Sequence, residues 1–325
     1  MDLAVSATTP GLTVTELAAL CEFAEELGYS QAWEAEVAGP DPFVLATAIA
    51  ARTKRMEVGV AAIPVYTRSP SALATAALSV SNVMGGRTFR LGLGSSSEVI
   101  VSQWHGLDWG NHLQRVTETV EAIRSILNGV NEYVGETVAT RRFRPAITAQ
   151  GPIEIWVAGL RPRMLAVAGA VADGVCLNLM PPRVVRQQLI AVSNGAEANG
   201  RPRPTGVMAR LQVMVTDDPA PVRQMLRSEF LGPYLAQPVY NRFLAWMGYE
   251  EEAAAIADAW SRRDREGLVA SISDRVVDDL ALVGDRAAVK GKLDEFAAAG
   301  VTVAALSVLV SDRRAVEDTL RSLAP

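Results

Sequence analysis

A glycine- and serine-rich run, GLGSSSE at residues 92–98, is the first candidate for ligand chemistry. Glycine lets a ligand approach the backbone closely, and the serines offer hydroxyl and N–H groups, so the run is suited to an anionic ligand. The alternative is a loop that needs glycine only for its turn. Because no third glycine follows, the run does not fit the fingerprint of a dinucleotide-binding site.

A second candidate is the segment AGLRP at residues 158–162, which joins an expected strand to an expected helix. Unpaired N–H groups and the macrodipole make a helix N-terminus attractive to phosphate. Arg161 adds a cation that can bind an oxyanion through two donors. The alternative is that Arg161 is an ordinary surface charge.

A third candidate is the pair Trp104 and His105, in a polar stretch that interrupts the regular pattern of the chain. Tryptophan offers a flat apolar wall, and histidine titrates near neutral pH. The alternative is that these two side chains only pack within the loop and bind no ligand. His112 fits an ordinary helix start, and Cys21 and Cys176 form no CxxC motif, so we expect no metal site and two buried thiols in a reducing compartment.

Eight short apolar segments alternate with helical patterns along the chain. The expected strands are 3–5, 30–34, 56–63, 88–94, 153–158, 174–177, 206–215 and 301–310. Such alternation predicts parallel strands with helical crossovers. Eight strands favour a closed (β/α)8 TIM-type barrel, an α/β fold whose active site lies on the loops after the strands. An open doubly wound sheet is the alternative.

Helix boundaries are marked by capping residues. Thr13 and Glu16 have the spacing of a capping box, and Gly28 stands where a helix would end. Asp285 and Gly300 bracket a late helix in the same way. Residues 219–280 carry helical patterns without a clear strand, so we expect a single domain over 1–325 with a helical insertion at 219–280.

Composition narrows the classes of function. The 325 residues are 49% hydrophobic and 21% charged, with a net charge of −5. This balance argues against a nucleic-acid partner. The sequence contains no stretch of 18 consecutive apolar residues, so we expect no membrane span. The N-terminus lacks the pattern of a signal peptide. We therefore expect a cytoplasmic protein that acts on a small-molecule substrate.

Four blocks of sequence together resemble the luciferase-like monooxygenase superfamily, and more closely its coenzyme F420-dependent oxidoreductases. The blocks are AWEAEVAGPDPFVLATAIAARTKRMEVG, VYTRSPSALATAALSVSNVMGGRTFRLGLGSSSEV, WVAGLRPRMLAVAGAVADGV and VGDRAAVKGKLDEFAAAGV. The resemblance implies a single β/α barrel, a homodimer, and a deazaflavin or flavin across the carboxyl ends of the strands.

The resemblance also implies which residues contact the cofactor. Relatives often carry a non-prolyl cis peptide in the third strand, which falls at Ala61 and Ala62 in this chain. The implied cofactor contacts are Ala61, Ala62, Gly94, Ser95, Ser96, Ser97, Ala158, Gly159, Leu160 and Arg161. The cofactor is expected to be F420, with FMN as the alternative.

One departure from the pattern concerns proton donation. Many F420-dependent relatives carry an acidic residue followed by histidine after the second strand, where this chain has Glu36 and Val37. Glu36, Glu98 and His105 therefore remain as catalytic candidates for moving a proton.

The expected function is hydride transfer between F420 and a small organic substrate. Three alternatives stay open. An FMN-dependent monooxygenase would share the fold, and the missing histidine motivates a non-catalytic F420-binding protein. A barrel hydrolase that uses Glu34 and Glu36 would bind no cofactor.

Overall fold

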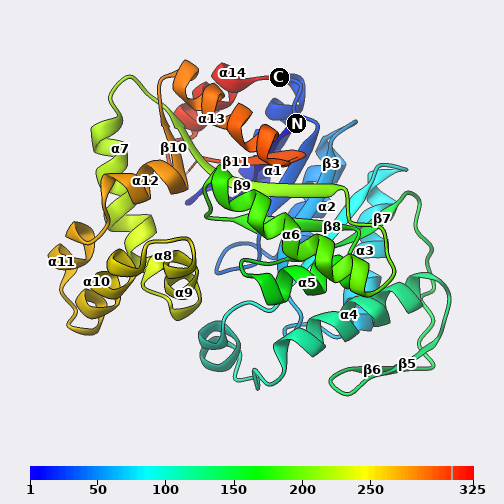
Figure 1. Ribbon diagram of the computed structural model, residues 1–325. Helices are drawn as coiled ribbons and strands as arrows, with labels where there is room; N and C mark the ends of the chain where they lie inside the picture. The colour runs from blue at the N-terminus through cyan, green and yellow to red at the C-terminus, as the bar shows by residue number, and fades with distance from the viewer. Residues whose placement is uncertain (309) are drawn as a thin grey trace.

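Eight parallel strands close into a barrel in the computed structural model, which describes residues 1–308 and 310–325 (Figure 1). The strands are β1 (Asp2–Ser6), β2 (Gln31–Glu34), β3 (Glu57–Pro64), β4 (Phe89–Gly94), β7 (Ile153–Ala158), β8 (Gly174–Asn178), β9 (Gly206–Val215) and β11 (Val303–Ser307). They follow the order β9-β11-β1-β2-β3-β4-β7-β8, and a further pairing of β8 with β9 closes the ring. The predicted barrel is confirmed, and the open sheet is wrong. Leu309, in the last expected strand, lies outside the described residues.

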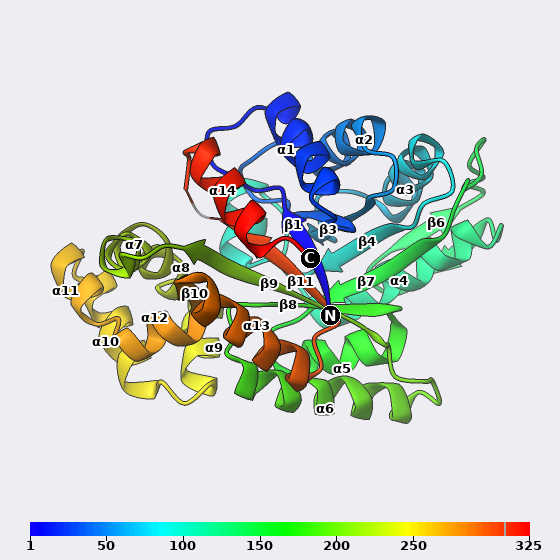
Figure 2. The ribbon, with the colours of Figure 1, turned by 90° about the horizontal axis from the view of Figure 1, so that it is seen from above.

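Helices surround the strands, as the view from above shows (Figure 2). The principal helices are α1 (Val14–Glu26), α2 (Pro42–Arg52), α3 (Pro70–Met84), α4 (His112–Leu127), α5 (Pro162–Val171), α6 (Pro182–Ala198), α13 (Arg286–Ala299) and α14 (Arg313–Leu323). The capping box of Thr13 and Glu16 is present, and the side chain of Asp285 accepts the N–H of Ala288 at 2.8 Å. Gly300 ends α13 with a φ of 109°, which favours glycine. These predicted boundaries are confirmed.

The helical segment after β9 lies to one side of the barrel, at the left of Figure 1. It consists of α7 (Pro219–Met225), the π-helical turn η2 (Leu226–Leu231), α8 (Gly232–Leu235), α9 (Pro238–Trp246), α10 (Glu250–Ser261), α11 (Arg265–Ala270) and α12 (Asp274–Leu280). The absence of a strand from 219–280 agrees with the prediction. Three short strands were not predicted: β10 (Ala281–Gly284), which pairs in parallel with the end of β9, and the hairpin of β5 (Glu132–Val134) with β6 (Ala139–Arg141).

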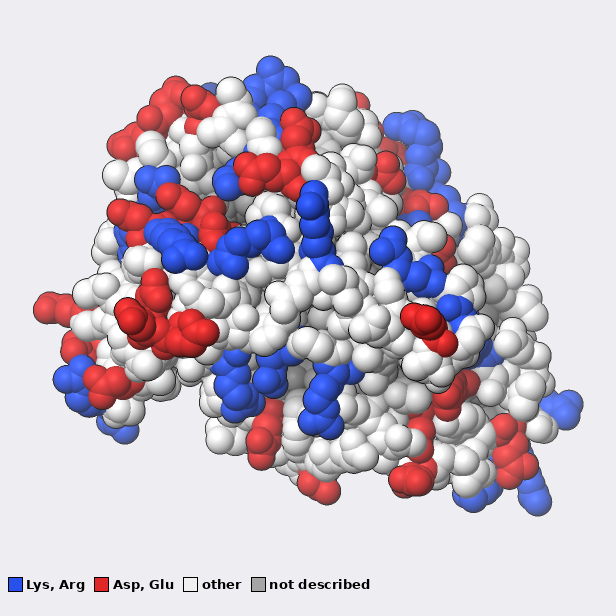
Figure 3. Space-filling view, viewed as in Figure 1, with Lys and Arg blue, Asp and Glu red and all other residues white. Residues whose placement is uncertain are grey.

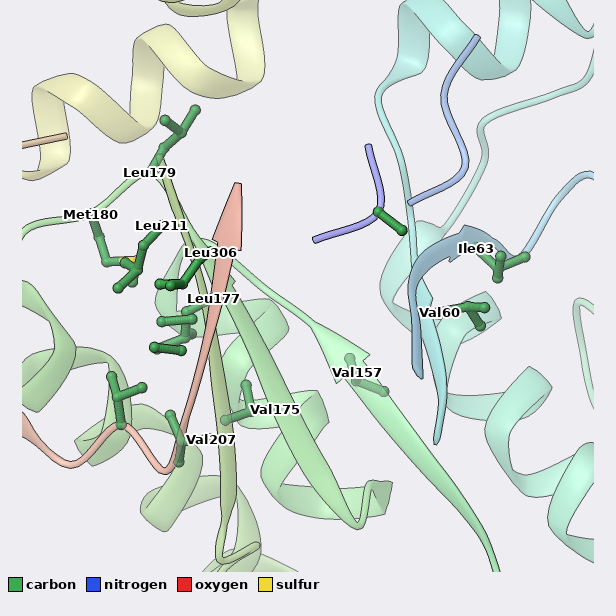
Figure 4. Close-up of a cluster of buried hydrophobic side chains, with 14 of the residues drawn as sticks. Val60, Ile63, Val157, Val175, Leu177, Leu179, Met180, Val207, Leu211 and Leu306 are labelled. Atoms are coloured by element: carbon green, nitrogen blue, oxygen red, sulfur yellow. The ribbon is translucent and has the colours of Figure 1, made fainter. Parts of the chain in front are cut away.

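The main apolar core lies between the strands and the surrounding helices. Figure 4 shows side chains of this layer from β3, β7, β8, β9 and β11, including Val60, Val157, Leu177, Leu211 and Leu306. None of the described helices is both long and apolar enough to cross a membrane. Both cysteines are buried and free, as expected.

A separate cluster fills the inside of the barrel. The rings of Trp33 and Trp156 lie 5.2 Å apart within it. Glycine makes room for them, because a Cβ at Gly59 would lie 2.4 Å from the ring of Trp33. A Cβ at Gly174 would lie 2.3 Å from the ring of Trp156. The barrel interior is therefore packed, and ligands must bind at its mouth.

Candidate active site

A floor of small residues lies toward the carboxyl ends of β3 and β4. It consists of Ala61, Ala62 and Gly94, and we call it the alanine floor. The peptide bond between Ala61 and Ala62 is cis, as the resemblance predicted, and both alanines are partly exposed. A Cβ at Gly92 would lie 2.4 Å from the carbonyl oxygen of Val60, and one at Gly94 would lie 3.0 Å from the Cβ of Ala62. Strand β4 therefore needs glycine where it passes the cis bond. The result is a flat surface with few side-chain atoms.

The serine run continues from this floor into the loop after β4. Ser95, Ser96 and Ser97 are half-buried, and Ser96 has a φ of 59°, in the left-handed region. The hydroxyl of Ser97 accepts the N–H of Ile100 at 3.3 Å and so stabilises the start of the π-helical turn η1 (Ile100–Trp104). At least one serine thus serves the turn itself.

The loop after β7 leads into a helix end without a side-chain cap. Arg161 occupies the N-cap position of α5, where its side chain accepts no hydrogen bond, and Pro162 begins the helix. The N–H of Gly159 donates to the carbonyl of Cys176 at 3.2 Å, which anchors the loop to β8. A Cβ at Gly159 would lie 3.1 Å from Leu165, so glycine lets the loop lie against the helix. The first N–H groups of α5 are therefore free of a side-chain acceptor.

Three exposed arginines, which we call the α5 arginine cluster, surround this helix end: Arg161, Arg163 and Arg242. Partial burial, and then the charges of Arg242 and Arg163, lower the pKa of Arg161. Burial, and then Arg163 and Arg161, lower the pKa of His112. Figure 3 shows basic side chains gathered where this face of the molecule is hollowed. The cluster and the helix end together suit a phosphate group.

An aromatic wall stands beside the loop after β3. Tyr66 and Trp109 stack with ring centroids 5.5 Å apart, and Trp109 stacks on His112 at 5.0 Å. The hydroxyl of Tyr66 donates to the carbonyl of Trp109 at 2.5 Å. Trp104, the tryptophan singled out from the sequence, is 54% exposed. Sequence reasoning therefore found the aromatic stretch but did not identify the residues that form the wall.

The three candidate proton carriers occupy different surroundings. Glu36 follows β2, forms an ion pair with Arg68 and accepts the hydroxyl of Thr67 at 3.1 Å. Glu98 and His105 lie on either side of η1 and are exposed. Among the described residues, no hydrogen bond or ion pair joins any two of the three candidates. Their roles stay predictions.

A polar wall on the last strands was not predicted. The side chain of Arg210, in the middle of β9, donates through Nη2 to the hydroxyls of Thr8 at 2.9 Å and Ser307 at 3.2 Å. Its Nε is buried and has no hydrogen-bond partner among the described residues, and burial lowers the pKa of the guanidinium. A signal was present, because Arg210 and Gln212 are the polar residues of the apolar strand GVMARLQVMV.

Further polar groups face the same place. Asn178 on β8 lies opposite Arg210 in the strand register, and its buried Oδ1 has no hydrogen-bond partner in the described part of the chain. It is within hydrogen-bonding reach of Tyr240, whose pKa is raised by burial and then by the nearby Tyr234. We call Thr8, Asn178, Arg210, Tyr240 and Ser307 the Arg210 wall.

The fold is a β/α barrel, and the candidate ligand site lies at the carboxyl ends of its strands, between the alanine floor and the Arg210 wall. Residues 2–303 match the family described as luciferase-like monooxygenase. The chain belongs to this family.

Known relatives cover nearly the whole chain. A putative coenzyme F420-dependent oxidoreductase of Mycobacterium tuberculosis is 26% identical over 316 residues, which cover 88% of each chain. A 5,10-methylenetetrahydromethanopterin reductase of Archaeoglobus fulgidus is 26% identical over 305 residues, covering 90% of this chain and 89% of the relative. The structure of coenzyme F420-dependent tetrahydromethanopterin reductase from Methanopyrus kandleri shares the fold, with a TM-score of 0.84 and 21% identity over 99% of this chain and 97% of that one.

Proposed function

We propose that the protein is an F420-dependent oxidoreductase that transfers a hydride between the deazaflavin cofactor and a small organic substrate. The observation that carries the proposal is the floor of small residues, Ala61, Ala62 and Gly94, at the carboxyl ends of β3 and β4. It is supported by the similarity, over most of the chain, to a relative named as F420-dependent. The proposal extends the family assignment to a cofactor and a reaction.

The residues at the mouth fit the cofactor. A flat ring needs a surface without protruding side chains, and Ala61, Ala62 and Gly94 provide one. A phosphate-bearing tail needs cations and free N–H groups, which the α5 arginine cluster and the uncapped end of α5 provide. When bound, F420 supplies a ring carbon that accepts or releases a hydride.

The chain's own residues would then bind and orient the cofactor and shield its ring from water. The alanine floor sets how closely the ring can approach the strands, and the stacked Tyr66 and Trp109 exclude water from one side. Arg161 would hold the phosphate and thereby fix the position of the ring. Glu98 and His105 are exposed, whereas Glu36 forms an ion pair with Arg68.

A binding titration tests the proposal. We would titrate the purified protein with F420, and separately with FMN, and follow quenching of the intrinsic tryptophan fluorescence. Tight F420 binding with weak FMN binding is expected. Preferential FMN binding would instead favour the monooxygenase function, and binding of neither cofactor would overturn the proposed site.

A matched pair of variants tests the placement of the cofactor. Arg161→Met should weaken F420 binding about tenfold or more, the usual scale for one charge-assisted hydrogen bond. Arg201→Met is the control, because Arg201 precedes β9, at the opposite end of the barrel, where it donates to the carbonyl of Ala172 at 3.3 Å. Equal weakening in both variants would contradict the placement.

Turnover separates an enzyme from a binding protein. Steady-state oxidation of reduced F420 by any member of a panel of small carbonyl and imine acceptors, or reduction of F420 by an alcohol, would establish catalysis. Bound F420 without turnover against the whole panel would favour a non-catalytic F420-binding protein.

A further inference from the structure

Arg210 is a cation whose described neighbours in hydrogen bonds and charge interactions are neutral groups. Its described hydrogen-bond partners are the hydroxyls of Thr8 and Ser307. Among residues 1–308 and 310–325, no carboxylate lies within ion-pair distance of it, and the titratable groups that act on it are the phenols of Tyr234 and Tyr240. A charge in the protein interior normally has a partner of opposite sign, because desolvation without one is costly.

The polar groups around Arg210 also lack partners. Within residues 1–308 and 310–325, the buried Nε of Arg210 and the buried Oδ1 of Asn178 have no hydrogen-bond partner. Gln212, two residues along β9, is 1% exposed, and neither its amide oxygen nor its amide nitrogen has a partner in the same ranges. Native proteins satisfy nearly all buried polar groups, so several unsatisfied atoms on adjoining strands indicate a missing polar ligand.

The position of the wall relates it to the reaction site. In the closed ring, β9 is four strands from β3 in either direction, so Arg210 and the Ala61–Ala62 floor stand on opposite sides of the mouth. Arg210 also keeps part of its surface exposed. A molecule that lies on the floor therefore faces Arg210 across the opening.

We propose that the Arg210 wall binds a carboxylate of the substrate, so that the compound oxidised or reduced here is a small organic acid. The proposal rests on the proposed function for its reaction, but the binding of the carboxylate can be tested separately.

The chemistry of the wall favours a carboxylate over a phosphate. A guanidinium fork matches the two oxygens of a carboxylate, and Nε is one corner of that fork. The hydroxyls of Thr8 and Ser307 supply further donors. The wall carries one positive charge, which balances a monoanionic carboxylate. A phosphate dianion would leave a negative charge without a counter-ion, and the α5 arginine cluster is the better site for it.

Matched ligand pairs provide the test. The probes are benzoate with benzamide and acetate with acetamide, each pair differing chiefly in charge, and phenyl phosphate as the dianion. Binding is measured by isothermal titration and by the shift in thermal midpoint, with and without F420. We expect each carboxylate to bind at least about tenfold more tightly than its amide, and phenyl phosphate to bind more weakly than benzoate.

Variants assign the binding to Arg210. Arg210→Met should lose at least about tenfold in benzoate affinity, and Arg210→Lys should recover part of that loss. Arg201→Met should bind benzoate like the unchanged protein. A merely structural role of Arg210 would change the thermal midpoint equally with and without benzoate, whereas a binding role removes only the benzoate-dependent increase.

The outcomes separate this inference from the proposed function. Equal binding of carboxylates and amides, failure of both carboxylates to bind, or unchanged benzoate affinity in Arg210→Met would overturn the inference. Tighter binding of phenyl phosphate than of benzoate would overturn the assignment to a carboxylate. F420 titrations on the same samples are independent: if carboxylates bind through Arg210 but F420 does not bind, the proposed function fails while the wall remains.

Discussion

Two arginines inside the same barrel have opposite surroundings. Arg90, near the amino end of β4, contacts Glu57 at 2.6 Å and Glu154 at 3.1 Å, and its guanidinium lies 5.7 Å from the ring centroid of Trp156. Arg210, in the middle of β9 and opposite the last residue of β8, contacts hydroxyl groups alone among the described hydrogen bonds. At the closed end of the barrel, carboxylates of the chain balance the charge of the arginine without a ligand. At the open end, the described partners of the arginine are neutral and leave its charge unbalanced.

The same contrast extends beyond the barrel. Glu118 on α4 is buried, but it accepts the N–H groups of Glu136, Thr137 and Val138 and so fixes the β5–β6 hairpin to the helix. The α5 arginine cluster, in contrast, consists of cations that act on one another. Charges with complete partner sets therefore hold the structure together, and charges without them are the candidates for ligand binding.

The largest effect is expected at Arg90. Arg90→Met would leave Glu57 and Glu154 facing each other without a cation and should lower the free energy of unfolding by about 3–4 kcal/mol. Arg52→Met is the control, because the pair of Arg52 with Glu22 is exposed, and its loss should cost less than about 1 kcal/mol. Urea unfolding measures both. Similar losses in the two variants would remove the basis of the comparison.

Glu118 gives a prediction with a pH dependence. Burial raises its pKa, but hydrogen bonds from Thr137, Gln114 and the backbone outweigh burial and lower the pKa from 4.5 to about 2. Because the folded-state pKa is the lower one, the stabilisation is present above pH 4.5 and is lost as the pH falls toward 2. Glu118→Gln should therefore lower the free energy of unfolding by about 3 kcal/mol at pH 7.

Unfolding in urea at several pH values measures this loss. The difference between the unchanged protein and Glu118→Gln should narrow as the pH falls from 4.5 to about 2. Thr117→Ser, on the neighbouring position of α4, is a control that should show no such narrowing. A difference that is constant over this range would show that the charge of Glu118 does not provide the stabilisation.

A smaller effect is expected at the alanine floor. A Cβ at Gly92 would lie 2.4 Å from the carbonyl oxygen of Val60 and 2.8 Å from the Cβ of Ala61, so Gly92→Ala should cost about 2 kcal/mol by overpacking. It should also weaken F420 binding, because the floor must shift. Gly291→Ala in α13 meets nothing within 4 Å and should stabilise the protein by about 0.5–1 kcal/mol. Thermal unfolding and the F420 titration compare the two, and a stable, F420-binding Gly92→Ala variant would contradict the role of the floor.

Most of the fold could be predicted because its signals are local. Most barrel strands are largely apolar runs, and helix ends carry residues such as Thr13, Asp285 and Gly300. The missed strands are short: β10 has four residues and follows a helix directly, and β5 and β6 have three residues each. A run of that length has too few alternations to distinguish it from a loop.

The site could be predicted only in part, because much of it depends on long-range contacts. The uncapped end of α5 and Arg161 are visible in the sequence, but Arg242 reaches the cluster from the helical segment after β9. The cis bond at Ala61–Ala62 could be predicted only from the family resemblance, because the sequence around two alanines carries no local signal for it. The Arg210 wall joins residues from both ends of the chain, such as Thr8 and Ser307, which sequence spacing cannot bring together.

The smallest expected effect is that of Arg210→Met on stability, which we compare with the effect of Arg90→Met. Without a ligand, Arg210→Met removes a cation that has lost part of its hydration and has only hydroxyl contacts in return among the described hydrogen bonds. The free energy of unfolding should therefore change by less than about 1 kcal/mol, in either direction, against the much larger loss in Arg90→Met. Urea unfolding of both variants in ligand-free buffer makes the comparison. A loss at Arg210 as large as that at Arg90 would mean that the hydroxyl groups alone hold the guanidinium in place, and the open end of the barrel would then be as complete as the closed one.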